Sequence, residues 1–341
     1  MLQNEITKKE NLLDASGNVA NPGYCVTCNY IYKRNEIKAH PMRIKEWNFY
    51  QISDDRYTIQ MNQFDISMGG AATFAIFDRK TGERFDVMHV DLLTLGKYNM
   101  PETDECDHTL SCKKNGFDFK IDVVGNKRTL TFQGKCKKGK IEADIELTVP
   151  ENLEYLVMAV PFKEDKHFYL NKKMNCMKAR GYVKCDGRVM ALNEDVAFGV
   201  LDWGRGVWPY KCDWYWGNGS MTLPGGKVFG FEIGWGFGDM SAFSENTLFY
   251  DGKAHKIENL TLTKDEKDIM KPWVFTSSDG RFEMMMTPEF DNFTSTRVLG
   301  VIGNRCHQVF GKWNGYVILD DGKRLEIKDM IAFCEHSDNR W

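Results

Sequence analysis

The chain contains 341 residues, of which 42% are hydrophobic and 27% are charged. These fractions are typical of a globular protein, and the length predicts two hydrophobic cores or one large β unit. The 45 basic and 48 acidic residues leave a formal net charge of −3. That balance argues against a nucleic-acid-binding protein, which usually carries a strongly basic domain or stripe.

The N-terminus and the cysteines favour a cytoplasmic protein. Residues 1–5 lack the basic and apolar segments of a secretory signal. No apolar stretch approaches the ~20 residues of a transmembrane helix, so we expect no membrane span. In a reducing cytosol the 10 cysteines are expected to be thiols. Cys25 and Cys28 form a C-x-x-C without the second pair that a structural zinc site needs. We therefore expect no metal and no cofactor, and the role of this pair stays open.

Alternation of apolar and polar residues predicts β-strands along most of the chain. The first 40 or so residues are less regular, and the first clear pair of strands lies at 44–50 and 57–61. The same alternation recurs at 117–123 and 260–263. It is strongest over 141–149, where every second residue is apolar and the residues between are acidic or Thr. One face of this strand should pack in a core and the other should face water.

Turn signals separate the predicted strands. Asp-Gly pairs at 186–187, 251–252, 279–280 and 321–322 favour the positive φ angles of tight hairpins. The basic cluster at 135–140 is typical of a solvated hairpin turn. Many short strands joined by such turns predict an all-β sandwich or barrel. We place the boundary between an N-terminal and a C-terminal β lobe near residue 190, giving lobes of 1–190 and 191–341.

Aromatic residues concentrate in one segment, 201–219, which contains four of the nine tryptophans. Glycines alternate with the rings. The candidate ligand-binding rings in this segment and just after it are Trp203, Trp208, Trp214, Tyr215, Trp216 and Trp235. A glycine lets a ring lie flat on a neighbouring backbone, so packing alone would explain them. Trp and Tyr also give broad apolar contact with one polar handle, which suits the wall of a ligand pocket.

Three charged residues, Asp202, Arg205 and Asp213, lie inside the same apolar run. Buried charge is costly unless it is paired, so this cluster needs a reason. An ion pair between Asp202 and Arg205 is one explanation. A bound ligand or a proton transfer is the other, because an aspartate in an apolar surrounding has a raised pKa that suits a general acid.

Two further places carry candidate site residues. Glu245 and Asn246 precede a predicted hairpin, where they would line a barrel mouth or satisfy turn amides. Near the C-terminus, Glu335 and His336 would form an acid–base pair or a surface pair.

Several of these motifs resemble a known family. The segments 201–206 and 214–217 are similar to the central motif of the bacterial family called domain of unknown function 2804. Glu245–Asn246, Trp47 and the closing segment 335–341 fit the same pattern. More distantly, the chain is similar to the lipocalin-type group of carotenoid hydratases, tocopherol cyclase and some Diels–Alder cyclases. That resemblance implies two lipocalin-like antiparallel β-barrel or β-sandwich lobes packed together, with an apolar, isoprenoid-like substrate between them.

We therefore expect a cofactor-independent enzyme that hydrates, isomerises or cyclises a hydrophobic small molecule by acid catalysis. Asp202 or Asp213 would be the acid, Arg205 would orient it, and the tryptophans would hold the substrate and any developing cation. One alternative is a non-catalytic binding protein for an apolar ligand. Another is a glycoside-processing enzyme, which needs two acids about 5–10 Å apart. The sequence leaves the ligand and the oligomeric state open.

Overall fold

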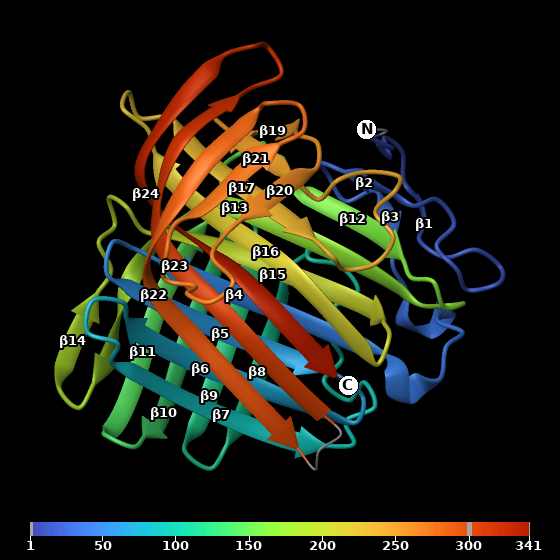
Figure 1. Cartoon of the computed structure of the whole chain (residues 1–341). Coiled ribbons are helices and arrows are strands. Elements are labelled where there is room, and N and C mark those ends of the chain that lie inside the picture. Colours follow the sequence, from blue (N-terminus) through green and yellow to red (C-terminus); the bar gives the residue numbers. More distant parts are fainter. Residues whose placement is uncertain (1–2, 299–301, 341) are drawn as a thin grey trace.

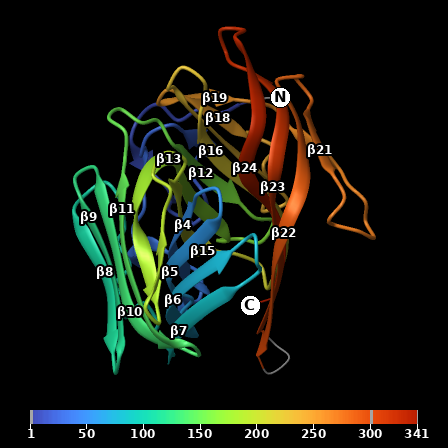
Figure 2. The ribbon, with the colours of Figure 1, turned by 90° about the vertical axis from the view of Figure 1, so that its left-hand side faces the viewer.

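The computed structural model describes residues 3–298 and 302–340. Within them the regular structure is β-strand, apart from two short 3₁₀ helices, η1 (Arg34–Glu36) and η2 (Pro41–Arg43). The strands form two large curled sheets that pack together, so the prediction of an all-β protein with two lipocalin-like lobes is confirmed. Figure 1 shows the second sheet, yellow to red, in front of the first, blue to green. Figure 2 shows the same sheets as two layers.

The first sheet contains thirteen strands within the described residues, and its main path runs in the order β7-β6-β5-β4-β15-β13-β11-β10-β9-β8. Strands β2, β12 and β14 pair beside this path. The strands are β2 (Gly23–Cys25), β4 (Lys45–Ser53), β5 (Tyr57–Asp65), β6 (Gly69–Asp78), β7 (Arg84–Leu92), β8 (His108–Lys114), β9 (Phe117–Val124), β10 (Lys127–Cys136), β11 (Gly139–Thr148), β12 (Leu156–Pro161), β13 (Phe168–Cys185), β14 (Arg188–Ala191) and β15 (Phe198–Val207).

The second sheet contains nine strands in the described part of the chain, in the order β19-β18-β17-β16-β24-β23-β22-β21-β20. They are β16 (Lys211–Thr222), β17 (Val228–Trp235), β18 (Thr247–Tyr250), β19 (Lys253–Lys256), β20 (Leu260–Thr263), β21 (Trp273–Ser277), β22 (Phe282–Val298), β23 (Ile302–Ile318) and β24 (Arg324–Arg340). A small parallel pair, β1 (Glu10–Asn11) and β3 (Tyr30–Ile31), lies near the N-terminus. The chain passes from the first large sheet to the second between Val207 and Lys211. The division into separate lobes near residue 190 stays a prediction.

Each sheet buries apolar side chains on both faces, because one face packs on its own core and the other on the opposite sheet. The core of the first lobe gathers residues of β4 to β13, and the core of the second gathers residues of β17 and β21 to β24. Between the sheets, Phe77 and Val200 of the first contact Trp216, Phe310 and Phe333 of the second. This arrangement explains why β15 is buried along its whole length instead of alternating.

Two of the hairpins predicted from turn signals are described by the pairing of their strands. Asp251 and Gly252 both have positive φ, 52° and 83°, and join β18 to β19. The basic cluster at 135–140 forms the hairpin between β10 and β11. Residues 141–148 of the alternating run lie in β11, where 141, 143, 145 and 147 are buried.

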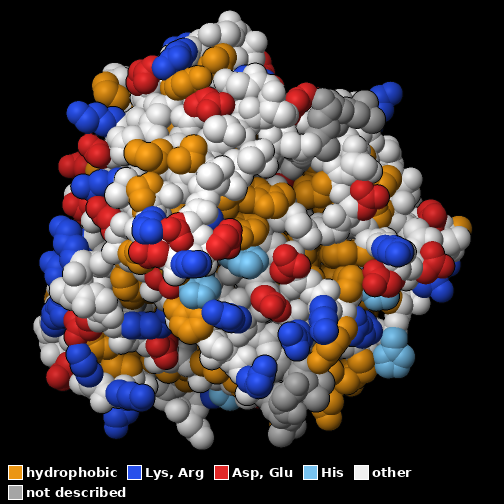
Figure 3. Space-filling view, viewed as in Figure 1, with side chains coloured by type: hydrophobic (Ala, Val, Ile, Leu, Met, Phe, Trp, Pro, Cys, Tyr) orange, Lys and Arg blue, Asp and Glu red, His pale blue; other side chains and the backbone are white. Residues whose placement is uncertain are grey.

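The surface carries both signs of charge. Figure 3 shows Lys and Arg interspersed with Asp and Glu over the face seen in Figure 1. Among the described residues, no helix combines the length and the hydrophobicity that a bilayer crossing requires.

Candidate active site

A cavity of about 60 Å³ lies where the two sheets meet. Strands β4, β13 and β15 of the first sheet form one wall, and β16 and β24 of the second sheet form the other. The lining residues are Trp47, Tyr169, Lys173, Asp202, Trp214, Tyr215, Trp216, Phe237, Glu245 and Glu335. The sequence predicted six of these as site residues: Asp202, Trp214, Tyr215, Trp216, Glu245 and Glu335. The fold brings the side chains of five together, and Tyr215 borders the cavity while its ring stacks on the other face of β16.

The two-residue period of the strands decides which side chains reach this cavity. In β16, Trp214 and Trp216 point toward the first sheet, whereas the ring of Tyr215 stacks on rings of the opposite face. In β24, Glu335 pairs with Trp216 of β16, so the two side chains lie on the same face of the second sheet. In β15, Asp202 faces the second sheet. The strand residues whose side chains face the cavity therefore occupy every second position of their strands.

Lys173 is the cation at the centre of the site. It lies directly opposite Asp202 in the register of β13 and β15, and its Nζ is 3.1 Å from Asp202 Oδ2. The same Nζ is 3.9 Å from Glu232 Oε1 and 3.7 Å from the centroid of the Trp216 ring. Burial lowers the pKa of Lys173, but Asp202 and Glu232 raise it more, so the pKa lies above its usual value. Lys173 is therefore held as an ammonium group among carboxyl groups.

Asp202 has a second partner in β13. Asn171 donates from Nδ2 to Asp202 Oδ1 at 2.6 Å and to the Trp203 carbonyl oxygen at 2.9 Å. Asp202 is thus fixed by an amide and an ammonium group, both from the neighbouring strand. This pairing replaces the predicted ion pair between Asp202 and Arg205, which is wrong.

Glu335 projects into the cavity from β24. Trp214 donates from Nε1 to its Oε1 at 3.0 Å, and Gln308 donates from Nε2 to its Oε2 at 3.2 Å. Burial raises the pKa of Glu335 from 4.5 to about 7, against the smaller effects of Trp214 and Lys173. Near neutral pH this carboxyl group is therefore able both to give and to take a proton.

Glu232 and Glu245 form a second acidic pair beside Lys173. Glu232 in β17 accepts a short hydrogen bond from Trp216 Nε1 and a 2.8 Å hydrogen bond from Asn218. Glu245, in the connection between β17 and β18, shares a hydrogen bond with Glu232. Burial raises the pKa of both groups, and their mutual repulsion adds to the rise for Glu232. Lys173 and the nearby buried Lys256, whose pKa burial lowers to about 7, cannot neutralise four buried carboxylates, so part of this cluster holds protons.

Gly234 and Asn246 place Glu245. Asn246 accepts from the Gly234 amide at 3.1 Å and donates to the Glu258 carbonyl oxygen at 2.9 Å, which pins the connection to β17. A Cβ atom on Gly234 would lie only 2.2 Å from Glu245 Oε2. The glycine is therefore required because the carboxyl group rests on its backbone. Asn246, predicted to contact ligand, is a positioning residue here.

Aromatic rings enclose the carboxyl groups. Trp47 lies flat on β15, where a Cβ atom on Gly204 would come within 2.3 Å of its ring. Its ring centroid is 5.5 Å from that of Tyr169, and Tyr169 in turn is 4.8 Å from Phe237. Trp214 meets Phe237 at 5.1 Å. These rings exclude water from the acids and offer π faces to a cation.

Four predicted residues, Asp213, Tyr215, Trp235 and His336, have their side chains on the opposite face of the second sheet. Asp213 is exposed and does not reach the cavity. His336 stacks on Tyr215 with ring centroids 4.3 Å apart, and Trp235 stacks on the other side of Tyr215 at 5.0 Å. Burial lowers the pKa of His336. Because Glu335 and His336 are consecutive in a strand, they point to opposite faces and do not form the predicted acid–base pair.

Arg205, Trp203 and Trp208 are buried in the packing of the fold. Arg205 donates to the carbonyl oxygens of Trp47 and Pro101 at 2.7 Å, and its guanidinium carbon lies 3.9 Å from the Trp203 ring centroid. Trp203 belongs to the core of the first lobe. Trp208 packs edge-on to Trp47 with ring centroids 4.9 Å apart and does not line the cavity. These residues support the wall rather than contact its contents.

The sequence did not identify five residues of the site, Lys173, Glu232, Tyr169, Phe237 and Trp47, and it noted Trp47 only as part of the family pattern. Lys173 and Tyr169 lie in β13, a long strand that begins with ten consecutive buried residues and so shows no alternation. Glu232 had a signal, since it stands alone between the apolar residues Phe231 and Ile233. A lone acid in an apolar strand is the same pattern that drew attention to Asp202.

The chain was compared with known families, curated proteins and solved structures. A family model described as domain of unknown function DUF2804 matches residues 3–341. The comparison with curated proteins gave no match. Among solved structures, kievitone hydratase from Nectria haematococca is similar with a TM-score of 0.49 and 11% identity, over 87% of this chain and 88% of that protein. A putative AttH from Nitrosomonas europaea is similar with a TM-score of 0.48 and 11% identity, over 92% of this chain and 98% of that protein.

Proposed function

The chain belongs to the DUF2804 family, described only as a domain of unknown function, and we propose that it is a cofactor-independent enzyme that protonates a carbon–carbon double bond of an apolar small molecule. One observation carries this proposal. Three carboxyl groups with raised pKa values, those of Glu232, Glu245 and Glu335, surround an ammonium group beside an aromatic-walled cavity. A passive carrier of an apolar ligand needs no such cluster, which costs folding free energy.

Glu335 is the proton donor in this proposal, because it lines the cavity and its pKa of about 7 leaves it about half protonated at neutral pH and mostly protonated below it. The proton adds to one alkene carbon, forming a C–H bond, and the other carbon becomes a carbocation. Glu335 is left as a carboxylate. The faces of Trp47, Trp214 and Trp216 stabilise the cation.

The fate of the cation decides the reaction class. Addition of water forms a C–O bond and releases a proton to the acidic cluster, which gives hydration. Loss of a proton from a neighbouring carbon to the Glu335 carboxylate gives isomerisation. Attack by a second double bond closes a ring and moves the positive charge to a new carbon, and loss of a proton from the carbon beside it to Glu335 completes cyclisation. In each case the Asp202–Lys173 pair keeps a fixed charge distribution next to the reacting carbons.

The test uses solvent deuterium. The protein is incubated in D₂O with geraniol or farnesol, and deuterium bound to carbon is measured by mass spectrometry in recovered alcohol and product. We expect incorporation with the native protein and a rate at least about 100-fold lower for Glu335→Gln. Asp213→Asn is the matched control, because Asp213 is exposed on the opposite face, and should keep the native rate.

Two results would overturn the proposal. One is binding of these alcohols with no deuterium on carbon after long incubation, which is the outcome expected of a non-catalytic binding protein. The other is an unchanged rate in Glu335→Gln.

A further inference from the structure

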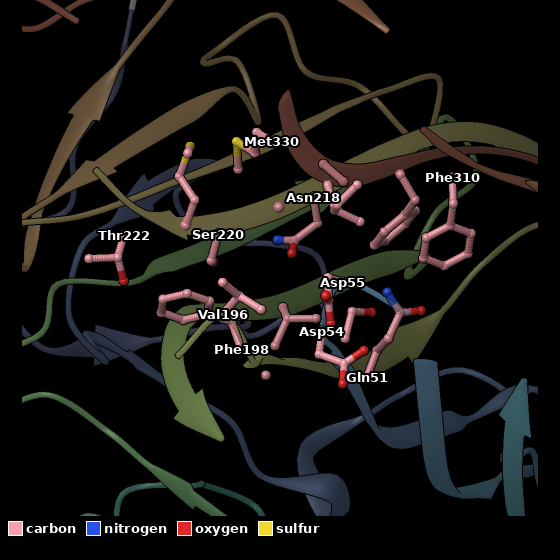
Figure 4. A pocket seen from close by; sticks show the side chains of 18 of the residues that line it. Gln51, Asp54, Asp55, Val196, Phe198, Asn218, Ser220, Thr222, Phe310 and Met330 are labelled. Atoms are coloured by element: carbon pink, nitrogen blue, oxygen red, sulfur yellow. The ribbon is translucent and has the colours of Figure 1, made fainter. Parts of the chain in front are cut away.

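A second and larger pocket, of about 200 Å³, lies between the same two sheets. It follows the acidic cavity along four of the same strands, β4, β15, β16 and β24. The side chains on these strands that face the opposite sheet and line the larger pocket are those of Gln51, Ser53, Phe198, Val200, Asn218, Ser220, Thr222 and Phe333. In Figure 4, Gln51 and Phe310 lie at one end of this pocket and Thr222 at the other.

Trp216 forms the wall between the two spaces. Its ring lines the acidic cavity, and its neighbours Val200, Phe310 and Phe333 line the larger pocket. The ring centroids of Trp216 and Phe333 are 4.9 Å apart with the planes nearly perpendicular. One layer of side chains therefore separates the two spaces.

Hydrogen bonds link the inner end of the larger pocket to the acids. Asn218, a lining residue, donates to Glu232 Oε2 at 2.8 Å. Gln51, another lining residue, accepts from Gln308, which also donates to Glu335. The outer rim is exposed at Asp55, Val196 and Asp329. The pocket thus runs from the surface to the side chains that hold the acidic cluster.

We propose that the larger pocket is a second ligand site, which binds an apolar ring-sized molecule that carries a hydroxyl or similar hydrogen-bonding group and acts on the acidic cavity through Asn218 and Gln51. This inference rests on the proposed function for its link to the acidic cavity. A cavity of about 150 Å³ holds a benzene ring, so 200 Å³ accepts one ring with a substituent. Phe198, Val200 and Phe310 supply the apolar contacts, and Gln51 and Asn218 the hydrogen bonds.

The test measures binding of 2-naphthol by isothermal titration calorimetry. Val196→Trp places a bulky ring at the rim, and Val189→Trp is the control. Both valines are exposed, at 44% and 59%, so both variants should fold, but Val189 does not line the pocket. We expect 2-naphthol to bind the native protein and Val189→Trp alike, and to bind Val196→Trp at least about tenfold more weakly.

Absence of 2-naphthol binding to the native protein, or equal binding to Val196→Trp, would overturn the inference. The deuterium assay with farnesol separates it from the proposed function. If 2-naphthol binds the native protein but leaves the rate at which farnesol gains deuterium unchanged, the larger pocket does not act on the acidic cavity, and the inference fails. If farnesol gains none in the native protein while Val196→Trp still blocks 2-naphthol, the ligand site stands and the proposed function fails.

Discussion

Replacement of Glu335 by glutamine should remove much of the pH dependence of folding. The pKa of Glu335 is about 7 in the folded protein and 4.5 without burial. A carboxyl group whose pKa is raised by folding contributes full stability below the unfolded pKa. That contribution is lost as the pH rises through the folded pKa. The difference corresponds to about 3 kcal/mol between pH 4.5 and pH values above 7.

Glutamine keeps an oxygen that can accept from Trp214 but has no proton to lose. We therefore expect Glu335→Gln to match the native free energy of unfolding at pH 5 and to exceed it by up to about 3 kcal/mol at pH 8. Urea unfolding followed by circular dichroism measures both values. Glu326→Gln, with an exposed acid on the same strand, should follow the native curve at both pH values. A parallel pH dependence of Glu335→Gln and native protein would refute the reasoning.

Two further substitutions probe the cluster. Lys173→Met removes the cation beside buried carboxylates and should lower the free energy of unfolding at pH 7 by about 3–5 kcal/mol, measured by urea denaturation. Lys184→Met is the control, because Lys184 is exposed on the same strand, and it should change this free energy little. Gly234→Ala should displace Glu245 and lower the rate of deuterium incorporation at least about tenfold. Gly303→Ala is the control, because a Cβ atom there has no neighbour closer than 3.6 Å, and it should keep the native rate. Equal rates in the two variants would contradict the placement of Glu245.

The strands and hairpins were predictable from the sequence because they depend on neighbours in the chain. The two-residue period at 141–149 and the Asp-Gly pair at 251–252 identified β11 and the β18–β19 hairpin directly. The pairing of the two sheets was not predictable in the same way. It buries both faces of β13 and β15, which removes the alternation that would mark an inward-facing residue.

The candidate site was predictable only in part for the same reason. Asp202 stood out as an acid in an apolar run and Glu335 as half of a predicted acid–base pair, and the fold places both in one cavity. Applying the strand period to residues 202 and 205 would have shown that their side chains point to opposite faces. Lys173 could not be found from its own strand, since its partner Asp202 becomes its neighbour only through the register of β13 and β15.

The assembly of the cluster across two sheets has an energetic consequence. Each sheet contributes acids, and Lys173 of the first sheet is the buried cation nearest to Asp202 of the first and Glu232 of the second. The closure of the sheets therefore sets the protonation of the acids, because burial is the largest cause of the raised pKa at Glu232, Glu245 and Glu335.

Infrared difference spectroscopy between native protein and Glu335→Gln, recorded as a function of pH, tests most directly whether this carboxyl group holds a proton near neutrality. A protonated carboxyl band assigned to Glu335 should be present at pH 6 and should disappear with a midpoint near pH 7. A carboxylate signal for this residue throughout the range from pH 5 to pH 9 would contradict its role as the proton donor.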